Sequence, residues 1–181
     1  MTTQQDVAEA MQRATSVFTR RPDMGVHADA SARAIWHGGT RISAHHAMGM
    51  QMETDMPCEL GGSGDRVSPG WLFRAGIAAC CATAIGMVAA SEGVELDALE
   101  IEVGSESDTR GLLGMQTPSG DGVQAGPLAM QIAVRIHAAR VDEARLRQIV
   151  ERGLQRSPMQ AAMQQPPPIE IRLTINDSNV D

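Results

Sequence analysis

The stretch S-P-G-W-L-F-R-A-G-I-A-A-C-C-A-T-A-I-G-M-V-A-A-S, residues 68–91, decides how the rest of this chain folds. Ser68 and Pro69 mark a helix N-terminus, because the hydroxyl can accept from a free amide and the ring suits the first turn. Arg74 is its only charged residue. A helix that is apolar on every side is either buried in protein or spans a membrane. A span needs about 20 apolar residues. The charge-free run 75–90 is shorter and contains two glycines, so we predict a buried central helix.

The composition narrows the partners that we expect. The chain of 181 residues carries a formal net charge of −7, contains no lysine and scatters its arginines along the sequence. With two Phe, two Trp and no Tyr, it lacks the aromatic residues on which single-stranded bases stack. We therefore expect no nucleic-acid partner.

The cysteines and the N-terminus indicate a compartment. Three cysteines, two of them adjacent, do not form the disulfide framework of a small secreted domain. The start M-T-T-Q-Q-D-V-A-E-A lacks the basic residues and the apolar run of a signal peptide. We predict a soluble cytoplasmic protein with reduced thiols and no membrane association.

The segment before the central helix predicts one helix and three strands. A helix over about 4–20 aligns Val7, Met11, Ala14 and Phe18 in one stripe. Two β-prone runs flank the pair Gly38-Gly39, which is typical of a hairpin. The two-residue period of a strand then places the methionines at 48, 50 and 52 on one face of a third strand.

The segment after the central helix predicts further strands and two helices. Apolar residues alternate with polar ones over 99–103 and 130–136, as in half-exposed strands. An amphipathic helix covers 142–155, and Ser157-Pro158 starts a short helix that ends at the prolines 166–168. Alternation of Ile169, Ile171, Leu173 and Ile175 predicts a last strand. The sequence therefore predicts an α+β fold with helices against antiparallel sheets.

Two motifs in this order resemble the OsmC/Ohr family of osmotically induced and organic hydroperoxide resistance proteins. The first is G-G-S-G-D-R-V-S-P-G-W-L-F-R-A-G-I-A-A-C at 61–80, and the second is D-x-R-G-x-x-G at 108–114. The resemblance covers about residues 32–175 and implies an intertwined homodimer. In that dimer, antiparallel sheets pack around two long helices, and the active sites lie at the subunit boundary. We expect an N-terminal helical extension over 1–24, a single OsmC-like domain over 25–176 and a tail over 177–181.

The resemblance also assigns site residues. Peroxidases of the family use a helix cysteine that attacks the peroxide and a second cysteine that resolves the sulfenic acid, assisted by a hairpin arginine and a glutamate at the helix start. Cys80 matches the attacking cysteine, and Arg41 in G-G-T-R matches the arginine. Two positions depart from the pattern, because Gly70 replaces the glutamate and Ser157 replaces the resolving cysteine.

The chemistry of the helix thiols follows from their position. Peroxide reduction needs a thiolate, and the helix dipole acts mainly over the first turn, so Cys80 needs a nearby cation such as Arg41 or Arg74. Successive residues on a helix point about 100° apart, which prevents a bond between Cys80 and Cys81. We interpret Cys81 as core packing, and Cys58 as the one thiol that could replace the missing resolving cysteine.

The role of Ser157 and the prospect of a metal have simpler interpretations. Ser-Pro is a common helix start, so Ser157 needs no catalytic role. The segment 45–58 holds two histidines, four methionines and a cysteine, whose soft ligands suit Cu(I). Alternate methionines on a strand are more often core or interface residues, and no zinc-type spacing is present. We predict neither a metal nor a cofactor.

Two functions from different classes remain. The first is weak thiol-dependent reduction of an organic hydroperoxide by Cys80, with resolution by Cys58 or by an external thiol, in an oxidative stress response. The second is a non-catalytic dimer that binds an apolar small molecule in its methionine-rich interior. The missing glutamate and cysteine favour the second, whereas the resemblance favours the first.

Overall fold

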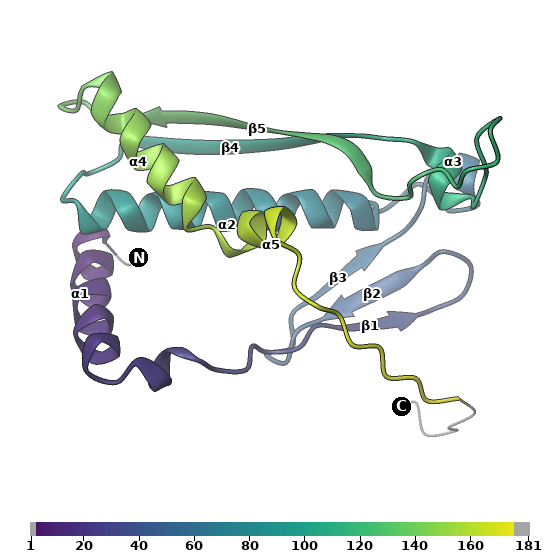
Figure 1. Ribbon diagram of the computed structural model, residues 1–181, viewed down its shortest axis with the longest axis horizontal. Coiled ribbons are helices and arrows are strands. Elements are labelled where there is room, and N and C mark those ends of the chain that lie inside the picture. The colour runs from purple at the N-terminus through teal and green to yellow at the C-terminus, as the bar shows by residue number, and fades with distance from the viewer. Residues whose placement is uncertain (1–2, 176–181) are drawn as a thin grey trace.

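A computed structural model describes residues 3–175 and places one long helix, α2 (Pro69–Ser91), through the middle of the chain (Figure 1). Its start is the predicted one, because the Ser68 hydroxyl accepts a hydrogen bond from the Trp71 amide at 3.1 Å. By length and composition α2 could cross a membrane. Its C-terminal half is instead largely buried, whereas Trp71 and Phe73 near its start are 45% and 41% exposed.

The other helices and strands follow the predicted order up to residue 164. In chain order they are α1 (Gln4–Arg20), η1 (Pro22–Gly25), β1 (Arg33–Trp36), β2 (Ile42–His45), β3 (Gln51–Thr54), η2 (Cys58–Leu60), then after α2, β4 (Ala98–Ser107), α3 (Thr109–Leu112), β5 (Pro127–His137), α4 (Glu143–Gln155) and α5 (Pro158–Gln164).

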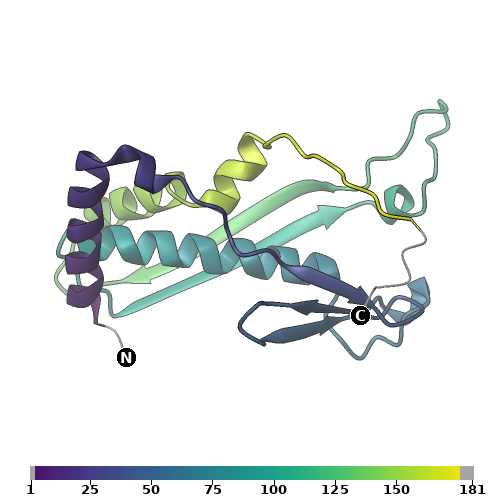
Figure 2. The ribbon, with the colours of Figure 1, turned by 90° about the horizontal axis from the view of Figure 1, so that it is seen from below.

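The strands form two separate antiparallel sheets. β1, β2 and β3 make one sheet in that order, and the long strands β4 and β5 make the other. The β4–β5 pair and α4 lie on one side of α2, whereas the three-stranded sheet lies near the N-terminal end of α2 (Figures 1 and 2). The predicted α+β class, with helices against antiparallel sheets, is confirmed.

The apolar core lies where α4 and the β4–β5 sheet cover the C-terminal half of α2. Ile85, Val88 and Ala89 from α2 pack there with Ile149 from α4, and each is at most 1% exposed. Every second residue over 99–103 and 130–136 is partly buried, which explains the alternation seen in the sequence. Full burial of one such side chain contributes about 1.5–3 kcal/mol.

α1 crosses the far end of α2 and packs against it (Figure 1). Thr3 and Asp6 form a capping box at its start, and the Gln4 side chain accepts a hydrogen bond from the Leu96 amide at 2.9 Å. Of the predicted stripe, Met11 is half-buried, whereas Phe18 is 45% exposed. The division into an extension over 1–24 and a domain over 25–176 stays a prediction.

Two predicted strand assignments differ from the structure. No strand forms over 169–175, where the alternating apolar side chains are 70–85% exposed, because no neighbouring strand pairs with them within the described chain. Of the three methionines predicted to share a strand face, only Met52 lies in β3, since Met48 and Met50 belong to the preceding turn. The predicted tail over 177–181 lies outside the described residues.

Gly153 allows the closest approach of α4 to α2. A Cβ atom built on Gly153 would lie 2.5 Å from Ile85 Cγ1, 2.6 Å from Ile85 Cα and 2.9 Å from Ile85 N. The last two atoms belong to the backbone of a core helix and cannot move aside like the end of a side chain. Any residue larger than glycine must therefore push the helices apart.

We predict that Gly153→Ala lowers the free energy of unfolding by about 2 kcal/mol, because overpacking a well-packed core typically costs that much. Urea denaturation followed by circular dichroism measures the change. Gly86→Ala is the matched control, since among the described residues no atom outside its own helix lies within 4 Å of a Cβ built there. That variant should keep or raise stability by about 1 kcal/mol. Equal losses in both variants would contradict the close-approach explanation.

Candidate functional site

The two helix cysteines meet at one serine hydroxyl. Ser157 Oγ donates a hydrogen bond to Cys80 Sγ at 3.3 Å, and Cys81 Sγ donates one to Ser157 Oγ at 3.5 Å. Ser157 and Cys81 are both fully buried, whereas Cys80 is partly exposed. All three thiols of the chain are free. Residues 77 positions apart in sequence are thus brought into direct contact.

The chain between α4 and α5 delivers Ser157 to this place. α4 ends at Gln155, the Ser157 amide bonds to the Leu154 carbonyl at 3.1 Å, and Pro158 begins α5. The predicted short helix is confirmed, but the serine does not cap it, because its side chain makes no capping hydrogen bond. Its hydroxyl faces the two cysteines instead. The interpretation of Ser157 as a simple helix start is therefore incomplete.

Cys80 borders an apolar cavity of about 480 Å³. The cavity lies between α1, α2 and the start of α5, and its lining comprises Met11, Cys80, Thr83, Ala84, Met87, Val88, Arg156 and Pro158. Arg156 brings the one charged side chain of this lining. Among the described residues, Cys80 is thus the one thiol on the wall of this mainly apolar space.

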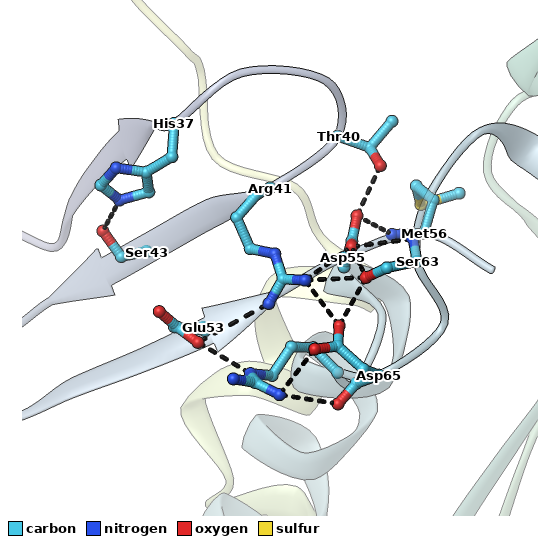
Figure 3. A network of polar contacts seen from close by, with 10 residues as sticks. His37, Thr40, Arg41, Ser43, Glu53, Asp55, Met56, Ser63 and Asp65 are labelled. Atoms are coloured by element: carbon cyan, nitrogen blue, oxygen red, sulfur yellow. Dashed lines mark hydrogen bonds and ion pairs between the residues drawn. The ribbon is translucent and has the colours of Figure 1, made fainter. Parts of the chain in front are cut away.

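Arg41 lies in a different polar network at the loop before α2 (Figure 3). Its Nη2 atom is 2.6 Å from Asp65 Oδ1 and 3.1 Å from Asp55 Oδ2, and it donates to Ser63 Oγ at 2.7 Å. Its Nη1 atom is 3.7 Å from Glu53 Oε2. These contacts hold the β1–β2 hairpin to the loop before α2.

Asp55 is the buried centre of this network. Its side chain is 5% exposed, and it accepts hydrogen bonds from the Ser63 amide and hydroxyl, the Thr40 hydroxyl and the Met56 amide. The Ser63 and Thr40 hydroxyls, in that order, hold the pKa of Asp55 well below its ordinary value. The pKa of Asp65 is also lowered, first by Ser63 and then by Arg41.

Cys58 lies on the exposed side of the same loop. It starts η2, and its thiol donates to the Ser63 carbonyl at 3.4 Å. Among residues 3–175, no hydrogen bond or ion pair joins Cys58 or Arg41 to Cys80. Cys80 lies about 16 Å along the helix axis from Pro69. Within the described part of one subunit, therefore, neither Cys58 nor Arg41 is joined to Cys80. Their shared catalytic role stays a prediction.

The family model for OsmC-like proteins matches residues 62–172. The chain belongs to this OsmC-like family. The match spans α2, both long strands, α4 and α5, so Cys80 and Ser157 lie within it, whereas α1 and its Met11 lie outside. No curated protein sequence matches the chain.

Solved structures of OsmC-like proteins share the fold. An OsmC-like protein from Mycoplasma pneumoniae is 15% identical with a TM-score of 0.64, over 78% of this chain and 91% of that one. An organic hydroperoxide resistance protein from Legionella pneumophila is 24% identical with a TM-score of 0.54, over 77% and 92%. A detoxification response protein from Psychrobacter arcticus is 20% identical with a TM-score of 0.58, over 76% and 90%. These likenesses confirm the resemblance seen in the sequence and its fold.

Three features of this OsmC-like site were absent from the sequence interpretation. The sequence pattern proposes Arg41 or Arg74 rather than Arg156 as a cation for Cys80, places Met11 in the N-terminal extension, and predicts core packing alone for Cys81. The adjacency of Arg156 to Ser157, the position matching a resolving cysteine, was a signal that could have identified the first. Nothing in the sequence places Met11 beside Cys80. Among the described residues, no group of three or more His, Cys, Asp or Glu side chains is placed to hold a metal.

We predict that the Asp55 network makes stability depend on pH. A carboxyl whose pKa is lowered by folding contributes stability that is complete above its unfolded pKa of about 3.9 and declines as the pH falls below it. Asp55→Asn should therefore be less stable than the parent at pH 7. The difference should shrink between about pH 4 and pH 2, where the unfolded-state carboxyl binds its proton.

Urea titrations of both proteins across that range check this prediction. Asp29→Asn is the control, because that exposed carboxylate is paired with one exposed histidine. A constant stability difference between Asp55→Asn and the parent at every pH would contradict the assignment.

Proposed function

We propose that this OsmC-like protein reduces organic hydroperoxides slowly, with Cys80 as the reacting thiol and an external thiol as the reductant. The hydrogen bond from the Ser157 hydroxyl to Cys80 at 3.3 Å, at the edge of an apolar cavity, carries the proposal. A hydrogen bond to a thiolate stabilises the anion that attacks peroxide. The family includes proteins described as organic hydroperoxide resistance proteins.

The proposed reaction has two stages. The Cys80 thiolate attacks the outer oxygen of R–O–O–H, so that a sulfur–oxygen bond forms and the oxygen–oxygen bond breaks. The alkoxide leaves and takes a proton from solvent to become the alcohol, while sulfur loses two electrons and becomes a sulfenic acid. A small thiol then condenses with the sulfenic acid, releasing water, and a second thiol molecule displaces the mixed disulfide and restores Cys80.

Ser157 itself cannot resolve an oxidised Cys80, which favours a reductant from outside. A hydroxyl cannot form a disulfide, so the side chain nearest to Cys80 stabilises the thiolate but does not resolve the sulfenic acid. Cys81 is no substitute, because neighbouring helix residues do not reach disulfide geometry. The exposed Cys58 remains a competing route for resolution. Slow turnover and a tendency to over-oxidation follow from this arrangement.

We also propose that the protein acts as a cytoplasmic homodimer. Register places Ala34, Trp36, Ile42, Ala44 and Met52 on one face of the β1–β3 sheet, and Trp36 is 68% exposed there. The segment 169–175 likewise offers alternating apolar side chains that are 70–85% exposed. A second copy that covers this face and pairs with this segment would bury both. It would also supply an Arg41 from the other subunit to a Cys80 site at the boundary.

Light scattering behind a sizing column should therefore give twice the 19.3 kDa mass of the chain at low micromolar concentration. Replacing two exposed apolar residues, Ile171→Glu with Leu173→Glu, should shift the mass toward the monomer, because charges would replace apolar contacts at the proposed interface. Replacing the exposed Gln12 by Glu on α1 should leave it unchanged. A monomer mass for the parent chain would contradict the intertwined dimer.

The apolar cavity also supports the alternative function, which is binding of an apolar small molecule without catalysis. Most of its lining is aliphatic or thioether, and the helix-start glutamate and resolving cysteine of the family's peroxidases are replaced by Gly70 and Ser157. A site of this kind binds an apolar ligand through burial alone. The alternative predicts displacement of the fluorescent probe ANS by long-chain alcohols and no peroxide turnover.

Cumene hydroperoxide with excess dithiothreitol should give slow, measurable turnover that falls to background in Cys80→Ser. In Ser157→Cys, one equivalent of hydroperoxide should remove two titratable thiols and form a disulfide between residues 80 and 157, because the substituted sulfur lies beside Cys80. Mass spectrometry of the digested protein identifies that bond.

Three outcomes decide against the proposal. Turnover that persists in Cys80→Ser would overturn the assignment of the reacting thiol. A Cys58→Ser variant that stalls after one turnover, where the parent protein continues, would transfer resolution from the external thiol to Cys58. Absence of turnover together with ANS displacement would favour the binding function.

A further inference from the structure

We infer that Cys81 is a positioning residue for Cys80 and acts through the Ser157 hydroxyl. The inference rests on the proposed role of Cys80 as the reacting thiol. It gives the buried thiol a task beyond packing, and it explains why two adjacent cysteines and one serine converge. The three groups form a short hydrogen-bond chain from Cys81 through Ser157 to Cys80.

Once a thiolate forms, the number of hydrogens on the three groups fixes the donor-to-acceptor direction of the hydrogen-bond chain. A serine hydroxyl has one hydrogen and two lone pairs, and each thiol has one hydrogen. Between two neutral thiols the chain could run either way. A thiolate has no hydrogen to donate, so the thiolate must be the acceptor at one end, and the thiol at the other end must stay protonated.

Burial decides which sulfur carries the charge. Cys81 is 0% exposed and lies against the core, where an anion loses its hydration. Cys80 is partly exposed and borders the cavity that also contains Arg156. The thiolate therefore forms on Cys80, and Cys81 remains the neutral donor at the closed end of the chain.

The neutral Cys81 thiol favours the productive direction of the serine hydroxyl. By donating to Ser157 Oγ at 3.5 Å, it occupies an oxygen lone pair and leaves the hydroxyl hydrogen for Cys80 at 3.3 Å. Linked hydrogen bonds also polarise one another, which strengthens the second bond by about 10–30%. Among the described residues, Ser157 Oγ makes these two side-chain contacts and no other.

Few charged side chains line the cavity beside Cys80. Arg156, which lies between α4 and α5, is the charged residue of the cavity lining. α1 contributes the uncharged Met11 to this lining, and α2 contributes the uncharged Thr83, Ala84, Met87 and Val88. Altering Cys81 adds or removes no charge beside the Cys80 sulfur, so a change in Cys80 alkylation would reflect the hydrogen-bond chain or the packing.

The test is the pH dependence of Cys80 alkylation by iodoacetamide in the native protein, read by tandem mass spectrometry, which separates residues 58, 80 and 81. Ser157→Ala should slow alkylation of Cys80 at pH 7 about tenfold and move the midpoint up, because a hydrogen bond to a charged group is lost. Cys81→Ala should slow it about two- to threefold, since the serine hydroxyl loses both the polarising bond and the donor that directs its hydrogen toward Cys80.

Cys81→Ser is the decisive variant. A serine hydroxyl at position 81 can still donate to Ser157 Oγ, so alkylation should return to within about 1.5-fold of the parent. Equal slowing in Cys81→Ala and Cys81→Ser would assign the effect to packing and overturn the inference. An unchanged midpoint in Ser157→Ala, or faster alkylation of Cys81 than of Cys80 in the parent, would overturn it too.

The alkylation test is separate from peroxide turnover. If the alkylation midpoint of Cys80 shifts in the variants but no hydroperoxide is reduced, the hydrogen-bond chain stands and the proposed peroxidase function is overturned. If Cys80 reduces hydroperoxide but its alkylation midpoint stays the same in the variants at positions 81 and 157, the peroxidase function stands and the hydrogen-bond chain is overturned. Urea unfolding of each variant at pH 7 confirms that alkylation is compared between folded proteins.

Discussion

The close approach of α4 to α2 at Gly153 and Ile85 is the contact on which the candidate site depends. Ser157 follows Gly153 by four residues, and Cys81 precedes Ile85 by four residues. Cys81 lies about one helical turn before Ile85 on α2. The chain continues from Gly153 past the end of α4 to Ser157, so the contact at 153 and 85 holds Ser157 close to Cys81. A side chain at position 153 would separate the helices, and the serine hydroxyl would no longer bridge the two sulfurs.

The chemistry of the chain is divided between two places. Cys80, Cys81 and Ser157 lie where α2 meets the chain between α4 and α5, and one buried hydroxyl bonds to both sulfurs. Arg41 lies in the loop layer, where Asp55, Ser63 and Asp65 satisfy its guanidinium. An arginine with satisfied donors is held in a fixed position, and under the proposed homodimer it would meet the Cys80 of the other subunit from there. The proposed homodimer is the arrangement that would join the two places.

Much of the fold could be predicted from the sequence because its signals are local. The Ser68 cap, the Gly38-Gly39 hairpin and the alternation in β4 and β5 each depend on a few neighbouring residues. The strand expected over 169–175 did not form, because alternation describes a side-chain pattern and a strand also needs a partner edge. Resemblance to the OsmC-like family found Cys80 and Ser157, although the interpretation of the serine as a helix start missed its hydroxyl contact.

The sequence alone was enough for the fold class and the central apolar helix, because both follow from local patterns. The family resemblance added the expectation that Gly70 and Ser157 stand at the positions of two catalytic residues. Tertiary structure alone decided that Ser157 donates to Cys80, that Cys81 donates to Ser157, and that Met11 of α1 borders the same cavity. The physical reason is distance along the chain. Local patterns report backbone preference and the face that is buried, whereas a 3.3 Å contact between residues 80 and 157 depends on how α4 packs on α2.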